Sequence, residues 1–444
     1  MTTFRRGICY LLLLMCINSV LLLYCIPGTA AAVVTGIFLT VFYFCLHIAA
    51  LWDNAPLVRL RILNGGYELI LAVTVCFTAE IPLYIYLHFY EMEIPLHILL
   101  INAGVSVLLL FALLLNGVLR IFICSRQVGV MPKLFLLLLW WVPVVNFILL
   151  KKMLETSRRE YTFTLDRRNR NEVREGEKLC ETKYPLLMVH GIFFRDWEQF
   201  NYWGRIPKEL MDNGATVYYG NQQSSASVER CAGELKQSIL DIVQKTGCEK
   251  VNVIAHSKGG LDSRYAISCL GMGEYVASLT TINSPHHGCN YVRRLLDKIS
   301  DKTIQSIGKK YESVFTKVGD KNPDFFSGLQ DLTEKECARL NSLMHDDPRV
   351  LYQSVGSRMR SPSSAMFPLN VGYGIIKFYG GGENDGLVPT QSMAWGNFLG
   401  VLSPKRRQGI SHGDMIDLTR KDIEGFDVCE FYVDLVNKLK LQGL

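Results

Sequence analysis

The longest stretch of the chain without a charged side chain is the feature that most limits its fold. Between Gly7 and Trp52 the sequence contains no Asp, Glu, Lys or Arg, and Pro27 and Gly28 divide this stretch into two parts. The hydrocarbon core of a bilayer is about 30 Å thick, and a helix needs about 20 mostly apolar residues to cross it. The stretch therefore predicts two membrane-spanning helices.

Further apolar runs extend the predicted membrane block to residue 150. They cover about 69–89, 94–119 and 134–150. The first two are long enough to cross a bilayer, whereas the third is short and contains Pro143 and Asn146, so it is either a kinked span or a re-entrant hairpin. The whole chain is 49% hydrophobic and only 20% charged, which is unusual for a single soluble domain. We predict an all-α transmembrane domain of four to five helices over residues 1–150.

The character of the sequence changes after residue 150. Residues 151–183 are charged and poor in large apolar side chains, so we expect a solvated basic linker. Residues 184–444 alternate short apolar runs with amphipathic stretches, which predicts an α/β domain with a mainly parallel sheet. The predicted strands lie in "YPLLMVHG", at Ala215–Tyr219, and in "KVNVIAHS", "VASLTTINSP", "RVLYQSVGS" and "GIIKFYGG".

One predicted join between a strand and a helix carries a serine. In "KVNVIAHSKGGLDSRY", Ser257 follows an apolar run, and small residues stand two positions before it (Ala255) and two after it (Gly259). A nucleophile on a sharp turn needs small neighbours at these positions, because the backbone there approaches closely. The pattern alone is weak, and an ordinary strand–loop–helix join is the alternative. Within a strand–turn–helix of an α/β domain it predicts that Ser257 is a nucleophile.

The order of residues in the chain selects the partners of this serine. On such a fold the acid and then the histidine follow the nucleophile. His412, in "GISHGDMID", is the only histidine after the last plausible acid-bearing strand. Asp385, in "GGENDGLVP", is the favoured acid, with Glu383 as its nearest competitor and a plain Asp-Gly turn as the alternative. The oxyanion hole would take the backbone amides of Lys258 and Ile192.

Five segments carry a resemblance to a known family. In order, "YPLLMVHGI", "NYWGRIPKELMDNGATVYYGN", "KVNVIAHSKGGLDSRYA", "SLTTINSPHHG" and "GGENDGLVP" resemble segments of bacterial triacylglycerol lipases of the Pseudomonas and Burkholderia type. The Ala-x-Ser-x-Gly elbow is more similar to that of the small Bacillus lipases. The resemblance covers about 184–417 and implies an α/β-hydrolase fold with a helical lid at about 291–343. It implies Ser257 as nucleophile, Asp385 as acid and His412 as base.

The family also binds a structural calcium near the histidine. Asp414 matches one ligand, but Leu418 stands where a side-chain oxygen is expected, and "RSPSSAMF" lacks the acid expected upstream of Asp385. We therefore predict neither a metal site nor another cofactor.

These features together predict a membrane-anchored serine hydrolase that cleaves carboxylic esters of lipids through an acyl-enzyme. A phospholipase, a thioesterase or another acyl hydrolase is the alternative, because a triad sets the reaction and the pocket sets the substrate. A second alternative is a membrane transport or scaffold protein with an inactive hydrolase-like domain, and Glu80, near Pro82 in an apolar run, would suit it. The partners are a lipid or acyl-ester substrate and the membrane. The net charge of +6 fits anionic lipid headgroups, and no nucleic-acid-binding motif is found.

The distribution of basic residues predicts which side the hydrolase faces. Arg5 and Arg6 place the N-terminus in the cytoplasm by the positive-inside rule. Basic residues also follow the second and fourth spans, and a basic cluster follows residue 150. All of these groups lie on the cytoplasmic side, as the positive-inside rule requires, if 134–150 does not cross the membrane. The scattered, odd-numbered cysteines of the hydrolase part favour a reducing compartment. We predict a multi-pass protein of the cell membrane with a cytoplasmic hydrolase domain.

Overall fold

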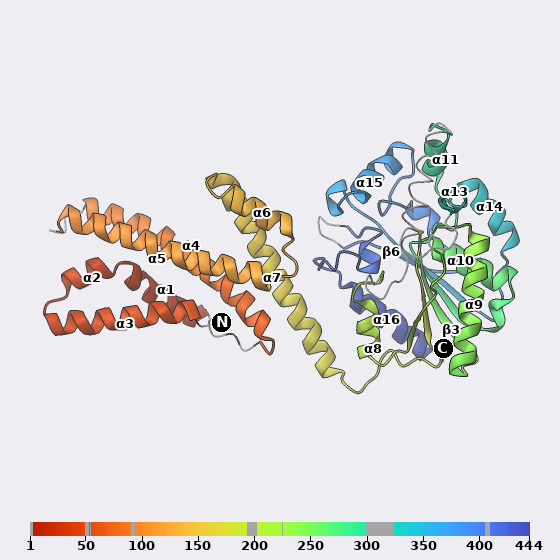
Figure 1. The fold of residues 1–444 in the computed structure, drawn as a ribbon, viewed down its shortest axis with the longest axis horizontal. Helices are drawn as coiled ribbons and strands as arrows, with labels where there is room; N and C mark the ends of the chain where they lie inside the picture. The colour runs from red at the N-terminus through yellow and green to blue at the C-terminus, as the bar shows by residue number, and fades with distance from the viewer. Residues whose placement is uncertain are drawn as a thin grey trace. The chain divides into compact units, whose positions relative to one another are not determined.

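The chain forms two compact units, Met1–Arg170 and Asn171–Leu444 (Figure 1). The structure is a computed structural model, and it describes residues 3–48, 53, 55–89, 94–192, 202–223, 225–298, 324–404 and 409–444. The first unit is built of helices alone, and the second contains a sheet covered by helices (Figure 1).

Among the described residues, the N-terminal unit has three helices of spanning length, or up to four, against the four to five predicted. Three helices, α3, α4 and α5, are long and apolar enough to cross a membrane. Helices α1 and α2 are bent by 75° relative to each other and make a fourth span only if the pair is one. The expected four to five spans are therefore corrected to three, or up to four. The helices are α1 (Thr3–Ile17), α2 (Ser19–Cys25), α3 (Thr29–Ile48), α4 (Val58–Phe89), α5 (Leu96–Cys124), α6 (Val130–Leu138) and α7 (Pro143–Val173).

The region around residue 150 also differs from the expected boundaries. The apolar run 134–150 is divided between α6 and α7, with a break after Leu138. Helix α7 then continues to Val173, so most of the expected linker 151–183 is helical. Its charged half is rich in Arg and Glu, which are good helix formers. Its Met153, Ser157 and Glu160 are buried, which stabilises the helix by packing as well as by propensity.

The second unit contains a six-stranded sheet in which all neighbouring strands are parallel, as predicted. The strand order is β2-β1-β3-β4-β5-β6. Every residue of β1, β3 and β4 is buried, as in a parallel sheet that is covered on both faces. Only β1 (LLMV) is a continuous apolar run, since β3 and β4 also bury polar residues such as Asn252 and Thr280. The strands are β1 (Leu186–Val189), β2 (Val217–Tyr219), β3 (Val251–His256), β4 (Val276–Ile282), β5 (Leu351–Ser357) and β6 (Asn397–Leu402).

Helices pack on both faces of the sheet. Leu186 and Met188 of β1 share one core with α8 and α16, whereas Leu187 and Val189 share another with α9 and α10. This alternation follows from the period of two residues along a strand. Figure 1 shows the two helix layers on opposite sides. The helices are α8 (Ile206–Asp212), α9 (Val228–Thr246), α10 (Lys258–Cys269), α11 (Asn290–Leu296), α13 (Phe325–Gln330), α14 (Glu334–Leu343), α15 (Leu369–Phe378) and α16 (Val428–Leu441).

One strand prediction is wrong and one part of the lid is not described. "GIIKFYGG" belongs to helix α15, whose buried Tyr373 and Ile376 are three residues apart and so share one helical face. A short apolar run does not by itself distinguish a strand from a helix. The last strand of the sheet is instead β6. Of the predicted lid 291–343, residues 299–323 lie outside the described part, and the remainder contains α11, α13 and α14.

Candidate active site

Ser257 lies on a sharp turn between β3 and α10. Its backbone has φ 55° and ψ −131°, a conformation that costs free energy in a residue with a side chain. A Cβ atom on Gly259 would overlap the carbonyl oxygen of His190, and one on Gly191 would lie 2.7 Å from Ser257 Cβ. The small residues around Ser257 are therefore required by the close approach of three backbone segments.

The two residues predicted as acid and base lie side by side. His412 Nδ1 and Asp385 Oδ2 are 2.6 Å apart, and Asp385 is fully buried. The amides of Leu387 and Val388 donate to the other carboxylate oxygen of Asp385 at 2.9 and 2.7 Å. The carboxylate is thus held in one orientation and can fix the tautomer and the rotation of the His412 ring.

Asn283 is a further partner that the sequence did not single out. Its side-chain amide donates to Asp385 Oδ2 at 2.6 Å and to Ser357 Oγ at 2.7 Å. Asn283 directly follows β4 and has a φ of 49°, which asparagine tolerates better than most residues. The only sequence signal for it is its position at the carboxyl end of a predicted parallel strand. The competitor Glu383 pairs with Arg358 instead.

The His412 ring packs against the ring of His256, the residue that precedes Ser257. The two ring centroids are 4.4 Å apart. Burial, and secondarily the proximity of His412, lower the pKa of His256 well below its usual value, so its ring is neutral. The Ser257 hydroxyl forms no hydrogen bond to another residue in the described part of the chain. Hydrogen bonds between nucleophile and base are often long in free enzymes.

Tyr202 connects this arrangement to the loop that follows β1. Its hydroxyl lies 2.7 Å from His256 Nδ1 and accepts a hydrogen bond from the amide of Gly191 at 3.1 Å. The ring of His190 is within 2.9 Å of the carbonyl oxygens of Gly191 and Gln222, which holds the same loop. This loop carries Ile192, one of the two predicted oxyanion-hole residues, and it lies against Ser257 Cβ. Tyr202 was not predicted as a site residue, although it lies within the segment "NYWGRIPKELMDNGATVYYGN".

Lys258, the second predicted oxyanion-hole residue, begins helix α10. Its side chain makes a buried ion pair with Asp262, with 2.7 Å between Nζ and Oδ1. Burial raises the pKa of Asp262 to about 7, against the opposing effect of the Lys258 ammonium. Because the side chain is held in this pair, only the backbone amide of Lys258 is available to a reacting oxygen.

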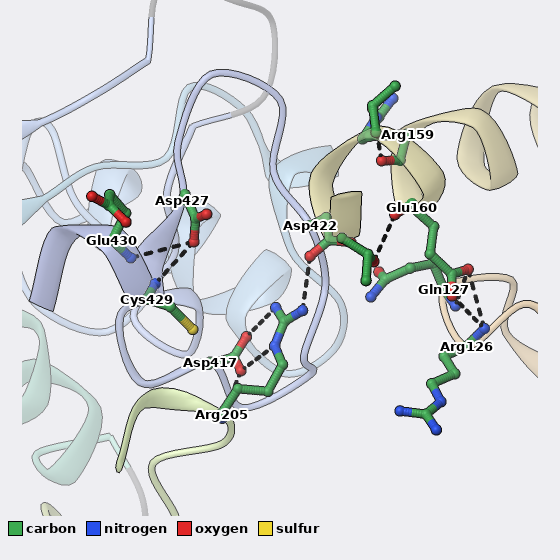
Figure 2. Close-up of polar contacts among 12 residues, drawn as sticks. Arg126, Gln127, Arg159, Glu160, Arg205, Asp417, Asp422, Asp427, Cys429 and Glu430 are labelled. Carbon is green, nitrogen blue, oxygen red and sulfur yellow. Dashed lines mark hydrogen bonds and ion pairs between the residues drawn. The ribbon is translucent and has the colours of Figure 1, made fainter. Parts of the chain in front are cut away.

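The residues present do not fit the calcium site that the resemblance implies. Asp414 Oδ2 accepts hydrogen bonds from the amide and the hydroxyl of Ser411, at 2.8 and 2.7 Å. The nearby Asp417 and Asp422 are paired with Arg205 (Figure 2). In the described part of the chain, no group of three or more His, Cys, Asp or Glu side chains could hold a metal ion.

The second unit has the α/β-hydrolase fold, with a parallel sheet and a serine on the sharp turn after β3. Residues 186–361 match the family described as "Putative serine esterase (DUF676)". The chain is 30% identical over 178 residues to the triacylglycerol lipase of Pseudarthrobacter phenanthrenivorans, an alignment that covers 37% of this chain. It is 29% identical over 287 residues to the triacylglycerol lipase of Vibrio cholerae, covering 60% of this chain and 90% of that lipase.

These matches confirm the resemblance to triacylglycerol lipases. The chain spans about half the length (55%) of the Pseudarthrobacter relative. Among solved structures, the Staphylococcus hyicus lipase is similar with a TM-score of 0.44 and 18% identity, covering 59% of this chain and 97% of that one.

Proposed function

We propose that this protein is a membrane-anchored serine hydrolase that cleaves carboxylic esters of lipids through an acyl-enzyme. Two observations carry the proposal: Ser257 lies on a strained turn, and the hydrogen-bonded pair of Asp385 and His412 contacts His256, the residue that precedes the serine. His412 accepts the proton of Ser257 as the hydroxyl oxygen attacks the ester carbonyl, and then gives that proton to the leaving alcohol. Asp385 orients the His412 ring and stabilises the imidazolium.

The developing oxyanion would be stabilised by backbone amides. Those of Ile192 and Lys258 lie on the two segments that flank Ser257, the loop after β1 and the first residue of α10. Preorganised amides of this kind stabilise the transition state more than the ground state. A water molecule, activated by His412, then hydrolyses the acyl-enzyme.

Helix α15 supports a lipid as the substrate. Its Leu369 lies close to the loops that carry the acid and the base. A Cβ built on Gly386, next to Asp385, would lie 2.9 Å from Leu369 O, and a Cβ on Gly413, next to His412, would lie 3.5 Å from Leu369 Cδ1. Helix α15 and the residues just before it expose four large apolar side chains: Met366, Phe367, Val371 and Phe378. Exposed apolar groups beside an ester-cleaving site suit a water-insoluble substrate. The relatives named triacylglycerol lipases agree with this choice.

Activity of the purified protein tests the proposal. A fluorophosphonate probe should label wild-type protein and leave Ser257→Ala unlabelled, and the wild type should hydrolyse a series of triacylglycerols. Glycerophospholipids and acyl thioesters in the same assay determine the substrate class. A correctly folded wild type that neither reacts with the probe nor cleaves any ester would contradict the proposal and favour an inactive domain.

Contacts within the first unit support a hairpin at residues 134–150. The Glu160 carboxylate on α7 accepts hydrogen bonds from Ser125 Oγ at 2.6 Å and from the amide of Arg126 at 3.1 Å, just beyond the end of α5 (Figure 2). It also pairs with Arg59 at the start of α4. If the segment between α5 and Glu160 crossed the bilayer, these groups would lie on opposite faces. The pairing therefore supports a segment that enters and leaves by one face.

The dimensions of α6 agree with partial insertion. Its nine residues measure about 14 Å, which is about half of the hydrocarbon core. The side-chain amide of Asn146 donates to the carbonyl of Trp140 at 3.1 Å, so one carbonyl at the break has an internal partner. Trp140 and Trp141 are 67% and 68% exposed, as expected of side chains that face lipid or its interface.

The basic residues at this face support a cytoplasmic hydrolase. Arg59, Arg126, Lys151 and Lys152 all lie near the ends of apolar helices at the face that Glu160 shares. Under the positive-inside rule this face is cytoplasmic. Because the hydrolase unit follows α7, we propose that it lies in the cytoplasm and acts at the inner membrane face.

Labelling with an impermeant thiol reagent tests the orientation. Cys269 is exposed on the hydrolase unit, whereas Cys180 is fully buried and serves as an internal negative control. Cys269 should remain unlabelled in intact cells and become labelled after the membrane is opened, and Cys269→Ser should remove this signal. Labelling of Cys269 in intact cells would place the hydrolase outside.

A further inference from the structure

Four consecutive residues, Tyr202–Arg205, contact three separate parts of the candidate active site. Tyr202 bonds to the loop of Gly191 and to His256, the residue before the nucleophile. The Trp203 ring packs against His256, with a centroid distance of 6.3 Å. Arg205 bonds to the segment that follows His412. A short segment outside the predicted triad therefore holds the surroundings of the nucleophile and of the base.

Arg205 makes the most extensive of these contacts (Figure 2). Its Nε donates to Asp417 Oδ2 at 2.7 Å and its Nη2 to Asp417 Oδ1 at 2.8 Å. Its backbone amide donates to the same Asp417 Oδ2 at 2.8 Å. Its Nη1 donates to Asp422 Oδ1 at 2.8 Å. One guanidinium thus binds two carboxylates, one of them in the bidentate geometry that favours arginine over lysine.

The two carboxylates need this cation because they are buried. The side chains of Asp417 and Asp422 are 1% and 4% exposed, while that of Arg205 is 26% exposed. Burial opposes the charge of Arg205, but its hydrogen bonds and the charges of both aspartates outweigh this and raise its pKa above the usual value. An exposed ion pair contributes little to structure, whereas two buried carboxylates without a partner would be strongly unfavourable.

The contact extends to the backbone on both sides. Gly204 has a φ of +54°, and a Cβ there would lie 2.7 Å from Asp417 Cβ, so only glycine fits. Asp417 itself has a φ of 54° and ends the short 3-10 helix Asp414–Ile416, which begins two residues after His412. Only one short helical turn separates Asp417 from His412, so a displacement of Asp417 would also displace His412.

We propose that Arg205 is a positioning residue that keeps the His412 ring aligned with Ser257 by holding Asp417 and Asp422. The inference rests on the proposed function, because it assigns a task within that active site. It explains why the segment after His412 needs no metal ion: the guanidinium supplies the positive charge from within the chain. A base displaced by about 1 Å can lose about 100-fold in rate.

The test compares Arg205→Ala with a matched variant of the same helix region. Lys208 lies three residues further on and makes an exposed ion pair with Asp212, so Lys208→Ala also removes one cation near α8. On a short water-soluble ester, Arg205→Ala should lower kcat about 100-fold with KM nearly unchanged, and Lys208→Ala should retain wild-type kcat. Millimolar guanidinium chloride should restore much of the lost kcat in Arg205→Ala, whereas the same concentration of sodium chloride should not.

The outcomes separate this inference from the proposed function. If the wild type reacts with no fluorophosphonate and cleaves no ester, the proposed function is wrong. If the wild type is active and folded Arg205→Ala keeps its kcat, or loses it without rescue by guanidinium, the positioning role is wrong. If Arg205→Ala does not fold, Arg205→Lys decides, because lysine keeps the charge but loses the bidentate contact. We then expect about a tenfold lower kcat, and an unchanged value would overturn the inference.

Discussion

The two units of this protein both bury an apolar core, but only the first also exposes large apolar side chains along its long helices. In the first unit the carboxylates of Glu68 and Glu160 are each 2% exposed, while Val33, Leu108 and Phe111 are each more than half exposed. In the second unit every residue of the central strands β3 and β4 is buried. The same physical rule accounts for both patterns if the exposed apolar side chains of the first unit face lipid, because apolar side chains avoid water in either case.

Buried polar groups also have different roles in the two units. In the first unit they join helices, as Arg6 does with Glu68 and Asn18 with Glu80. In the second unit they gather at the carboxyl ends of the parallel strands, where Asn283 and Asp385 meet. We therefore expect polar substitutions to reduce stability in the first unit and turnover in the second.

The largest effect should come from the base of the proposed triad. His412→Ala should lower kcat on a soluble ester by on the order of 10⁴-fold or more, because the nucleophile and its base act as one unit. The melting temperature should change far less than kcat, since the substitution removes one ring that contacts His256 and Asp385. Ser257→Ala should be similarly inactive, and combining the two substitutions should add little further loss. Near-normal turnover by His412→Ala would contradict the assignment.

The next effect should be on the stability of the first unit. Glu160→Gln removes a buried carboxylate from Arg59 and from the loop after α5, and breaking such a pair costs about 3–5 kcal/mol. Unfolding in detergent, followed by the helical circular dichroism signal, measures this cost. The kcat on a soluble ester should stay near that of the wild type if the two units act separately.

A matched variant makes the Glu160 result specific. Glu181 makes an exposed ion pair with Lys178, so Glu181→Gln should leave the unfolding curve unchanged. An equally unchanged curve for Glu160→Gln would contradict the proposed contact between Glu160 of α7 and the residues just after α5, and with it the hairpin.

A smaller effect should come from the close crossing of α4 and α5. A Cβ on Gly117 would lie 2.7 Å from Ile70 Cγ1 and 3.0 Å from the carbonyl oxygen of Gly66. Gly117→Ala should therefore cost about 1–3 kcal/mol by overpacking. Gly104 lies on the same helix with nothing within 4 Å of such a Cβ, so Gly104→Ala should not destabilise the unit. Equal effects of the two substitutions would show that the helices do not cross as closely as described.

Sequence reasoning predicted the parts of this molecule that depend on local pattern. The parallel sheet follows from apolar runs, and the turn at Ser257 follows from its small neighbours, because a local conformation determines both. Charge-free length predicted helices of membrane-spanning length, of which the described residues contain three, or four if α1 and α2 form one span, against the four to five expected. Pro143 and Asn146 predicted the break after Leu138, whereas the bend after Ile17, where Asn18 bonds to Glu80 and Asn102, depends on distant residues.

Long-range contacts explain what the sequence did not reveal. "GIIKFYGG" has the composition of a strand, yet Tyr373 and Ile376 bury one face of helix α15. Tyr202, Asn283 and Arg205 lie in two of the segments that resemble the lipases, but the resemblance assigned them no role. Only the fold places them beside His256, Asp385 and Asp417. Their roles depend on residues 54, 102 and 212 positions away, which no local pattern encodes.

The smallest expected effect is that of removing calcium. The Asp414 carboxylate accepts a hydrogen bond from the amide of Ser411, and the side chain of Leu418 contains no oxygen. The charges of Asp417 and Asp422 are paired with Arg205. A calcium ion prefers six to eight oxygen ligands, and these carboxylates already have partners within the chain. A chelator should therefore leave both the melting temperature and the ester-hydrolysis rate of the wild type unchanged, in a thermal scan and an assay with and without added calcium. In Arg205→Ala the same two aspartates lose their cation, so added calcium should raise the melting temperature of that variant alone. A wild-type melting temperature that falls with chelator and recovers with calcium would show that the guanidinium does not replace a metal ion.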